Sequence, residues 1–343
     1  MPGIGYGIVN NQELRADLAA YVASSPDIDD MLIGEQVMPV FNVDAASGQF
    51  LTESISDSGT QSGAGLDTAP GSEYAEDTSV NGYRYYFTSK RTAKAVVPEE
   101  FESYLTRYNY DLQARKTALK VRGMKIRQEV RVNAAIMNEA NFTSSAPVAV
   151  YTNANQVLTT GADPVADITA LILANNTYGV MPDTLIISNP VYNYILKNPN
   201  FLNVYKPFGL TAPNSIADYN AVLNMFRDRG IKRVLIPMAS QNTAAVGVGA
   251  TPVMSPIWSN TYIWCGKTMG GSPSLGGAGR ILVWSKMGGL YTIKSWWDNN
   301  TDSTQIGIKQ FSNEIILGQE NAQGNAAGVS TFGQLCKVAY TGS

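Results

Sequence analysis

A single long helical pattern most constrains what this 343-residue chain can fold into. Val97-Pro98-Glu99-Glu100 is typical of a helix start, because proline suits the first turn and acidic side chains interact favourably with the positive end of the helix dipole. Apolar residues then recur every three, four or seven positions as far as about Ala140, namely Phe101, Leu105, Tyr108, Leu112, Leu119, Ile126, Val130 and Met137. About 40 residues in one helix predict a rod of roughly 60 Å, which favours a structural building block over a catalyst.

Charge is distributed unevenly along the chain. Residues 1–83 carry one basic residue, Arg15, against thirteen acidic ones, whereas residues 84–131 carry twelve basic residues against five acidic ones. The rest is nearly balanced, and the formal net charge is −3. Such a split is typical of an acidic part that lies against a basic part, in the same subunit or in a neighbour.

A long polar segment precedes the predicted helix. Residues 44–82 are rich in Ser, Gly, Thr, Asp and Glu and contain few large apolar side chains, so they cannot build a core of their own. Strand-like patterns flank this segment near Gln49–Ser54 and Tyr83–Val97. Because a structureless loop of this length is uncommon in a compact domain unless it reaches another body, we predict a long two-stranded finger.

The second half of the chain predicts a mixture of helices and strands. The two patterns alternate over residues 175–240, which favours an α/β layer, and strand patterns dominate from Thr261 onward. Near the other end of the chain, Glu13–Ser24 is typical of a short helix. Cys265 and Cys336 are too few to indicate a disulfide framework or a zinc site, so we predict buried thiols. No run of 18 apolar residues is present, so no membrane partner is predicted.

Recognisable catalytic chemistry is scarce in the sequence. Histidine is absent, which removes the commonest general base and the commonest transition-metal ligand. Asp298–Asp302 begins like a calcium loop, but Ser303 stands where glycine is needed and Lys309 where a bidentate glutamate is needed, so we predict a turn. We therefore predict no enzyme and no catalytic, cofactor-binding or metal-binding residue. For an alternative carboxylate-based hydrolase or lyase, only Asp183 and Asp228 are candidates, and both are expected to be caps or surface residues.

A run of eight basic residues lies on the predicted helix. These residues are Arg107, Arg115, Lys116, Lys120, Arg122, Lys125, Arg127 and Arg131. Such a face could meet phosphates, but aromatic residues are not interleaved with it and the whole chain is acidic. We therefore favour a solvated face, or one that receives an acidic loop, over specific recognition of nucleic acid.

The order of these pieces resembles the major capsid proteins of tailed bacteriophages, which have the Hong Kong 97 fold that encapsulins share. The most specific part of the resemblance runs from Met38-Pro39-Val40 through the Ala69-Pro70-Gly71 turn and Tyr83–Phe87 to Ala95-Val96-Val97-Pro98-Glu99-Glu100 at the helix start. The resemblance covers most of the chain as an order of elements, without an invariant motif. It implies an α+β fold in five parts: an N-terminal arm with a short helix (1–43), an extended β-hairpin loop (44–97), a peripheral domain with a long spine helix (98–174), an α/β axial domain (175–290), and a return to the peripheral domain with C-terminal strands (291–343).

The resemblance also implies a mechanism for the charge split, because each extended loop of this family lies on the neighbouring subunit. The acidic residues expected in such a contact are Glu53, Asp57, Asp67, Glu73, Glu76 and Asp77. The basic residues expected to receive them on the spine helix are Arg115, Lys120 and Arg127.

The function implied is a structural one. The chain is expected to assemble through pentamers and hexamers into an icosahedral shell that encloses phage double-stranded DNA, which it contacts nonspecifically. A scaffolding protein, a portal and a cement protein are the further partners implied, and the protein is expected in the virion after assembly in the host cytoplasm. An encapsulin-like compartment with an enzyme as cargo stays open as a second interpretation. A tail or decoration protein is a third, against which the long helix argues.

Overall fold

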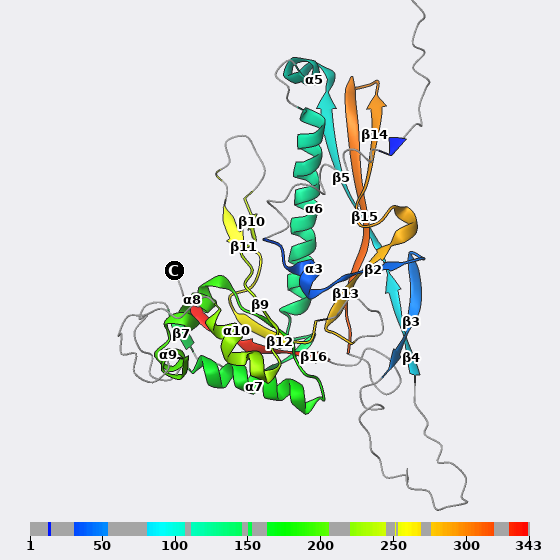
Figure 1. Cartoon of the computed structure of the whole chain (residues 1–343). Coiled ribbons are helices and arrows are strands. Elements are labelled where there is room, and N and C mark those ends of the chain that lie inside the picture. Colours follow the sequence, from blue (N-terminus) through cyan, green and yellow to red (C-terminus); the bar gives the residue numbers. More distant parts are fainter. Residues whose placement is uncertain are drawn as a thin grey trace, which may run out of the picture.

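The computed structural model describes residues 13–14, 31–53, 81–106, 111–145, 150–152, 163–205, 220–244, 251, 253–268, 276–318 and 329–341. Figure 1 shows an elongated half, in which a long sheet lies beside the helix α6, and a compact half, in which helices cover a second sheet. A two-stranded hairpin, β3–β4, projects from the elongated half. The mixed helix and sheet architecture is therefore present as predicted.

The predicted single helix over residues 98–140 is in fact two helices, α5 (Glu99–Thr106) and α6 (Leu112–Ile136). Asp111 ends the continuity, because its backbone is extended and its carboxylate accepts a hydrogen bond from the Ala114 amide at 2.9 Å. This is an N-cap, so α6 begins afresh at Leu112. Its 25 residues span about 37 Å instead of the predicted 60 Å.

The buried side of α6 also differs from the predicted apolar stripe. Leu119 is 57% exposed, and Phe101 in α5 is 59% exposed. The buried apolar residues of α6 are instead Ala114, Val121, Met124, Val132 and Ile136. The prediction was wrong for Leu119 and Phe101, because small and medium side chains pack on the sheet residues Ala95 and Val97 instead. Other members of the predicted stripe do pack into the cores, namely Leu112, Ile126, Val130 and Met137.

Six strands form the sheet of the elongated half, with β15 (Ser303–Ile316) at its centre. On one side β15 pairs antiparallel with β14 and then β13, and on the other side with β5. β13 pairs in parallel with β2, and β1 pairs with β14. The bounds of these strands are β1 Glu13–Leu14, β2 Val40–Val43, β5 Ser89–Pro98, β13 Gly279–Trp284 and β14 Thr292–Asp298. The strand pairing of β1 contradicts the helix predicted to start at Glu13, and residues 15–24 lie outside the described residues.

The connection between β14 and β15 is the turn predicted for residues 298–302. Asp298 pairs with Ser303 in the antiparallel register. The Asp298 carboxylate accepts a hydrogen bond from the Asn300 amide at 3.1 Å, and Asp302 adopts a positive φ of 38°. An Asx turn therefore accounts for the run that begins like a calcium loop.

The predicted finger is present as the antiparallel pair β3 (Ser47–Glu53) and β4 (Asn81–Phe87). The amide and the hydroxyl of Thr88 both donate to the Ala46 carbonyl at 2.8 Å, which closes the base of the hairpin. After Thr88 the chain enters β5, which pairs with β15 over ten positions. The prediction of one return strand from Tyr83 through Val97 is thus wrong, because its second half belongs to the central sheet.

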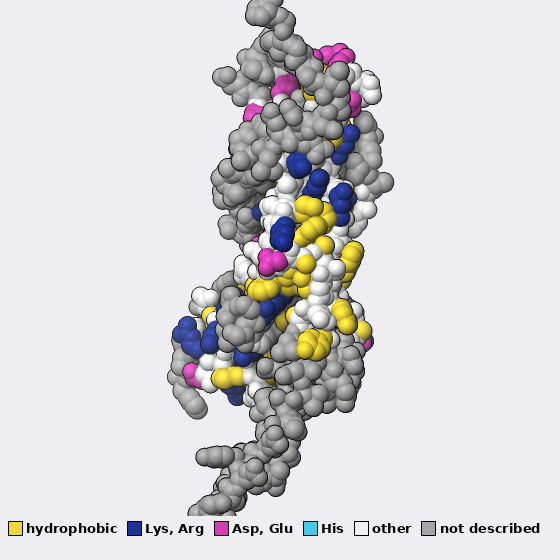
Figure 2. Space-filling view, turned by 90° about the vertical axis from the view of Figure 1, so that its right-hand side faces the viewer, with side chains coloured by type: hydrophobic (Ala, Val, Ile, Leu, Met, Phe, Trp, Pro, Cys, Tyr) yellow, Lys and Arg dark blue, Asp and Glu magenta, His cyan; other side chains and the backbone are white. Residues whose placement is uncertain are grey.

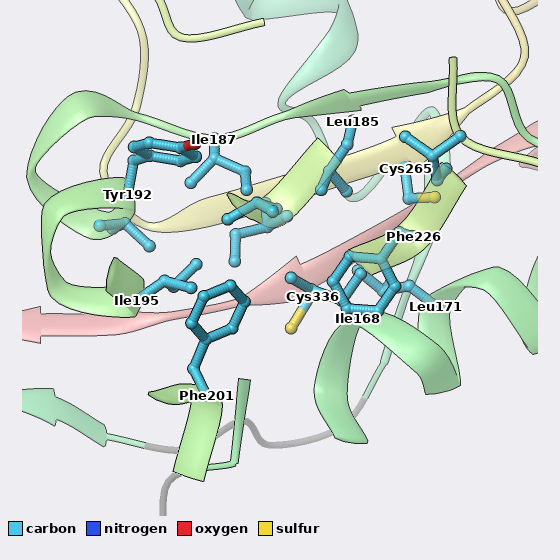
Figure 3. Packing of buried hydrophobic residues seen from close by; sticks show 14 of the residues in the cluster. Ile168, Leu171, Leu185, Ile187, Tyr192, Ile195, Phe201, Phe226, Cys265 and Cys336 are labelled. Atoms are coloured by element: carbon cyan, nitrogen blue, oxygen red, sulfur yellow. The ribbon is translucent and has the colours of Figure 1, made fainter. Parts of the chain in front are cut away.

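The compact half contains a five-stranded sheet in the order β6-β16-β12-β8-β9. Four helices bury their apolar sides against it, and Figure 3 shows Cys265 and Cys336 among the aromatic and aliphatic side chains of this core. Both thiols are buried and free, as predicted. The bounds are β6 Phe142–Ser145, β8 Thr184–Ile186, β9 Arg233–Leu235, β12 Tyr262–Gly266 and β16 Ser330–Lys337, with α7 Pro164–Thr177, α8 Asn189–Lys197, α9 Pro199–Tyr205 and α10 Ala221–Phe226.

The other face of the five-stranded sheet joins the two halves. Trp264 and Leu335 point from this face toward Val132 and Ile136 at the end of α6. Trp264 also meets Phe142 edge to face, with ring centroids 5.9 Å apart. The core is therefore continuous from one half to the other. The remaining short elements are α3 Gly34–Val37, β7 Val150–Thr152, η1 Arg227–Arg229, β10 Ser240–Asn242, β11 Met254–Pro256, η2 Ser285–Met287 and β17 Ala339–Thr341.

Candidate subunit-contact surfaces

The predicted basic contact residues are exposed side chains of α6. Arg115, Lys120 and Arg127 are all exposed, and Arg115 lies on a different side of the helix from Lys120 and Arg127, because it precedes them by five and twelve positions. Lys120 and Arg127 are seven residues apart, which places them two turns apart on nearly the same line of the helix. Their charged groups are thus accessible to another molecule.

Lys116 and Arg131 of the basic run bind groups of the same subunit. The Lys116 ammonium donates to the Val96 carbonyl at 2.6 Å. Arg131 and Arg91 bind the two carboxylate oxygens of Glu314 at 3.0 and 3.2 Å, and the Glu314 side chain is only 7% exposed. Part of the basic run therefore stabilises the contact between α6 and the sheet, a division that the sequence alone did not predict.

One acid on α6 is buried, which the sequence pattern did not predict. Glu129 is 3% exposed, and its carboxylate accepts hydrogen bonds from the Ile33 amide at 3.0 Å, the Gly34 amide at 2.8 Å and the Trp258 indole at 2.6 Å. Burial raises the pKa of Glu129, while these hydrogen bonds act in the opposite direction. A Cβ at Gly34 would lie 2.5 Å from a Glu129 carboxylate oxygen, so a larger residue there would displace this carboxylate from its hydrogen bonds. Glu129 therefore links α3 and the β11–β12 connection to α6. The sequence offered one signal of this role, because Glu129 is the only acidic residue within α6.

The predicted acidic contact residues cannot be placed against this helix. Asp57, Asp67, Glu73, Glu76 and Asp77 lie outside the described residues. Glu53 is the last residue of β3, where the described part of the outgoing strand ends.

One face of the finger exposes a row of aromatic side chains. Tyr83, Tyr85 and Phe87 alternate along β4 and are 56%, 78% and 67% exposed. On the opposite face, Arg84 donates to the Ile316 carbonyl and Tyr86 packs near Phe50, with centroids 6.5 Å apart. The finger is therefore anchored by one face and presents an unpacked aromatic face. We call Tyr83, Tyr85 and Phe87 the aromatic row; the sequence predicted the strand but not this surface.

The candidate carboxylates of an enzyme have structural explanations. Asp183 accepts hydrogen bonds from the Thr184 hydroxyl at 2.7 Å and from the Thr268 amide and hydroxyl at 2.9 and 3.0 Å. This ties the end of β12 to the start of β8. Asp228 is exposed within the short helix η1.

Other features that could support catalysis or metal binding do not form a recognisable site among the described residues. Within the described part of the chain, no group of three or more His, Cys, Asp or Glu side chains is arranged to hold a metal ion. Burial raises the pKa of the Cys265 thiol, which opposes its ionisation. A cavity of about 240 Å³ lies between the finger and the body, lined in part by Arg84, Asn141 and Glu314, but Glu314 is already paired with two arginines. No helix among the described residues is long and apolar enough to cross a membrane.

Comparison with known proteins rests on structure alone. No protein-family model matches the sequence, and no curated protein matches it. A phage-related protein from Bordetella bronchiseptica is similar over 95% of this chain and 97% of its own, with a TM-score of 0.61 and 15% identity. The capsid of cyanophage P-SCSP1u is similar over 99% of this chain and 93% of its own, with a TM-score of 0.52 and 10% identity. A virus-like particle from Pyrococcus furiosus is similar over 96% of this chain and all of its own, with a TM-score of 0.50 and 11% identity.

These likenesses extend over nearly the whole chain in both directions. The chain therefore has the α+β fold of phage capsid proteins, and this part of the fold prediction is confirmed. At this level of identity the comparison establishes the fold. The contact surfaces described above rest on the residues of this chain and not on the comparison.

Proposed function

We propose that this chain is the major capsid protein of a tailed phage, a structural subunit that assembles through pentamers and hexamers into an icosahedral shell around double-stranded DNA. The observation that carries the proposal is the likeness to a phage capsid over 99% of this chain and 93% of the other. The exposed aromatic row supports it, because a large exposed apolar surface usually marks a site of interaction. A structural role also agrees with the lack of histidine.

The five-part division of the Hong Kong 97 fold belongs to this proposal. In it, residues 1–43 form the arm, 44–97 the extended loop, 98–174 and 291–343 the peripheral domain, and 175–290 the axial domain. The long sheet beside α6 supports the peripheral part, and the helix-covered sheet supports the axial part. Scaffolding protein, portal and cement protein are the further partners we propose, with assembly in the host cytoplasm.

We further propose that the acidic segment of one subunit lies on α6 of its neighbour. Arg115, Lys120 and Arg127 would receive the acids Glu53, Asp57, Asp67, Glu73, Glu76 and Asp77. A single exposed ion pair contributes only about 0.2–1 kcal/mol. Contacts repeated around a closed shell add up to a stable assembly, because each subunit is held by several neighbours at once.

The double variant Lys120→Glu/Arg127→Glu tests this contact. We expect a folded subunit that forms at least tenfold fewer shells, since both cations are exposed and their reversal repels an acidic partner. Shell yield is measured by sedimentation and electron microscopy, and folding by circular dichroism. Lys232→Glu in the compact half is the matched control, since Lys232 is also exposed. A normal yield of shells from the double variant would contradict the proposed contact.

Contact with packaged DNA is proposed to be nonspecific. The net charge of −3 supports this, because a strongly basic wall would hold phosphates and hinder a moving duplex. A shell with protein cargo is the second candidate function, since the virus-like particle from Pyrococcus furiosus has the same fold. Nuclease-protected DNA in purified particles favours the phage, whereas a co-purifying enzyme without DNA favours the compartment.

Electron microscopy of the purified protein tests the main proposal. The protein is expressed alone and with any scaffold encoded beside it. Closed angular shells, or rings of five and six subunits, are the expected result. A monodisperse monomer or dimer under both conditions would overturn the proposal.

A further inference from the structure

The strand β5 forms one edge of the long sheet. Within the described part of the chain it pairs with β15 and with no other strand, over ten positions from Ser89 to Pro98. Strands are usually about five or six residues long, so this edge is a long one. An edge strand has backbone N–H and C=O groups that no neighbouring strand satisfies, and it can therefore accept a further strand.

Two observations identify the residues of β5 whose backbone groups point outward. In an antiparallel pair, alternate residues turn their N–H and C=O groups away from the partner strand. The Lys116 ammonium donates to the Val96 carbonyl at 2.6 Å, which places this carbonyl on the side away from β15. Pro98, two positions further, has no N–H, which suits an outward position. Thr92 and Lys94 have the same parity, so their backbone groups also point outward.

The side chains that alternate along this edge are exposed, and two of them are cationic. Lys90, Thr92 and Lys94 are exposed, whereas Ala95 and Val97, which have the other parity, are buried against α6. Successive side chains of a strand point to opposite faces of its sheet. The two lysines therefore lie on the face that points away from α6, beside the outward backbone groups. We call Lys90, Thr92 and Lys94 the β5 edge.

Positive charge is crowded around the β5 edge. Lys94 pairs with Gly307, which pairs on its other side with Lys294, so these two lysines share a face of the sheet. The pKa of Lys309 is lowered by burial and by the nearby charges of Lys294 and Lys90. Figure 2 shows Lys and Arg side chains gathered on the elongated half, beside a hydrophobic patch. A partner that supplies negative charge would relieve this repulsion.

The described strands of this chain do not supply a partner of matching charge. An added strand that neutralises the β5 edge needs acidic side chains opposite both Lys90 and Lys94. No strand within the described ranges contains two acidic residues. Duplex DNA could neutralise the lysines, but it has no extended peptide backbone to pair with the outward N–H and C=O groups. These two points favour an extended segment of another protein as the occupant.

We infer that the β5 edge is a strand-addition site for an extended acidic segment of a separate partner protein. The added strand hydrogen-bonds to the outward backbone groups of Thr92 and Lys94 and places carboxylates opposite the two lysines. The backbone contacts supply affinity, and the charges select an acidic segment. The inference rests on the proposed shell function, and it gives a further protein of the shell a place to bind and a chemistry.

A pair of synthetic peptides tests whether the contact is an added strand. In the first peptide Glu alternates with Thr, and in the second some of the Thr residues are replaced by Pro, which keeps the charge but removes backbone donors. Their affinities for the purified protein are measured by fluorescence anisotropy. We expect the first peptide to bind at least tenfold more tightly than the second. A first peptide that binds no better than its proline version would overturn the inference.

Thr92→Pro tests the same contact from the side of this chain. The Thr92 N–H points outward and takes no part in the ladder with β15, so proline should preserve the fold, as circular dichroism would verify. The substitution removes one donor from the β5 edge and blocks the close approach of another strand. We expect the Glu-Thr peptide to bind at least tenfold more weakly. An unchanged affinity in the folded variant would contradict strand addition.

Charge reversal tests the chemistry of the partner. Lys90→Glu/Lys94→Glu should bind the Glu-Thr peptide at least tenfold more weakly and should prefer a peptide in which Lys replaces Glu. Lys286→Glu/Lys337→Glu is the matched control, because both residues are exposed and lie outside the β5 edge. It should bind the Glu-Thr peptide as the unmodified protein does. An equal loss in the control would assign the binding to general attraction between opposite charges and overturn the inference.

The yield of shells separates this inference from the proposed function. Because the occupant is a separate protein, Thr92→Pro and Lys90→Glu/Lys94→Glu should form shells as the unmodified chain does. A loss of shells from both variants would overturn the inference by assigning the β5 edge to a contact between copies, while the shell function would stand. Failure of the unmodified chain to form shells would count against the shell function itself, and peptide binding would still decide the role of the β5 edge.

Discussion

The compact half and the finger use large aromatic side chains in opposite ways. In the compact half, Phe201 and Phe226 are fully buried between helices and sheet (Figure 3). In the finger, Tyr85 and Phe87 are mostly exposed, although they lie on a regular strand. The first region packs its rings within one chain, whereas the second leaves its rings exposed. We therefore expect the stability of the subunit and the proposed assembly to depend on different parts of the molecule.

A Phe→Ala substitution in each region tests whether buried and exposed rings contribute differently to the free energy of unfolding. Phe226→Ala removes a fully buried ring and should lower the free energy of unfolding by about 3–5 kcal/mol. Phe87→Ala removes a ring that is 67% exposed and should change it by no more than about 0.5 kcal/mol. Denaturant unfolding of the unassembled subunit measures both values.

Assembly should reverse the order of the two effects. Phe87→Ala is expected to reduce the yield of shells although the subunit remains stable, because an exposed aromatic surface usually marks a site of interaction. Equal destabilisation by the two substitutions would show that the finger is packed within its own subunit.

The sequence allowed the α+β fold to be predicted, because strand and helix periodicities and the Pro98 helix start are local signals. It also led to the correct buried state of Cys265 and Cys336. The faces of α6 could not be predicted in this way, because an exposed Leu119 and a buried Ala114 reverse the hydropathy rule. Which side packs depends on the shape of the sheet, and that is a tertiary property.

The contact surfaces were predictable only in part. Exposed cations such as Lys120 follow from a charged helix pattern. The proximity of Lys94 and Lys294 required the strand register, since they are 200 positions apart in the chain and both pair with Gly307. The buried carboxylate of Glu129 looked like any other charge on a helix until Trp258 and α3 were placed around it.

Glu129 shows that the elongated half also contains buried polar contacts that stabilise the subunit. Glu129→Ala leaves three buried donors without their acceptor and should cost about 2–4 kcal/mol of folding free energy. Glu139→Ala is the matched control, because Glu139 is exposed and accepts one hydrogen bond from Tyr262. It should cost less than about 1 kcal/mol. Denaturant unfolding checks both, and equal costs would contradict the clamp assigned to Glu129.

The pH dependence of the same residue gives a further prediction. Because burial raises the pKa of Glu129 above its ordinary value of 4.5, the folded state holds this proton more tightly than the unfolded state does. The contribution of Glu129 is therefore most favourable below pH 4.5, and it declines as pH rises from there to the raised folded pKa. Glu129→Gln should remove this decline. Unfolding measured across that window in both proteins provides the test, and parallel curves would show that Glu129 titrates normally.

The smallest expected effect concerns the caps that begin the main helix of each half. Asp111 caps α6, and Asp163 caps α7 through the amides of Val165 and Ala166. Asp111→Ala and Asp163→Ala should each cost about 1 kcal/mol, because each leaves helix amides without an acceptor. Hydrogen exchange should then become about fivefold faster in the first turn of the affected helix alone. If Asp111→Ala instead speeds exchange along the whole of α6, the elongated half opens as one unit and its stability depends on the start of this helix.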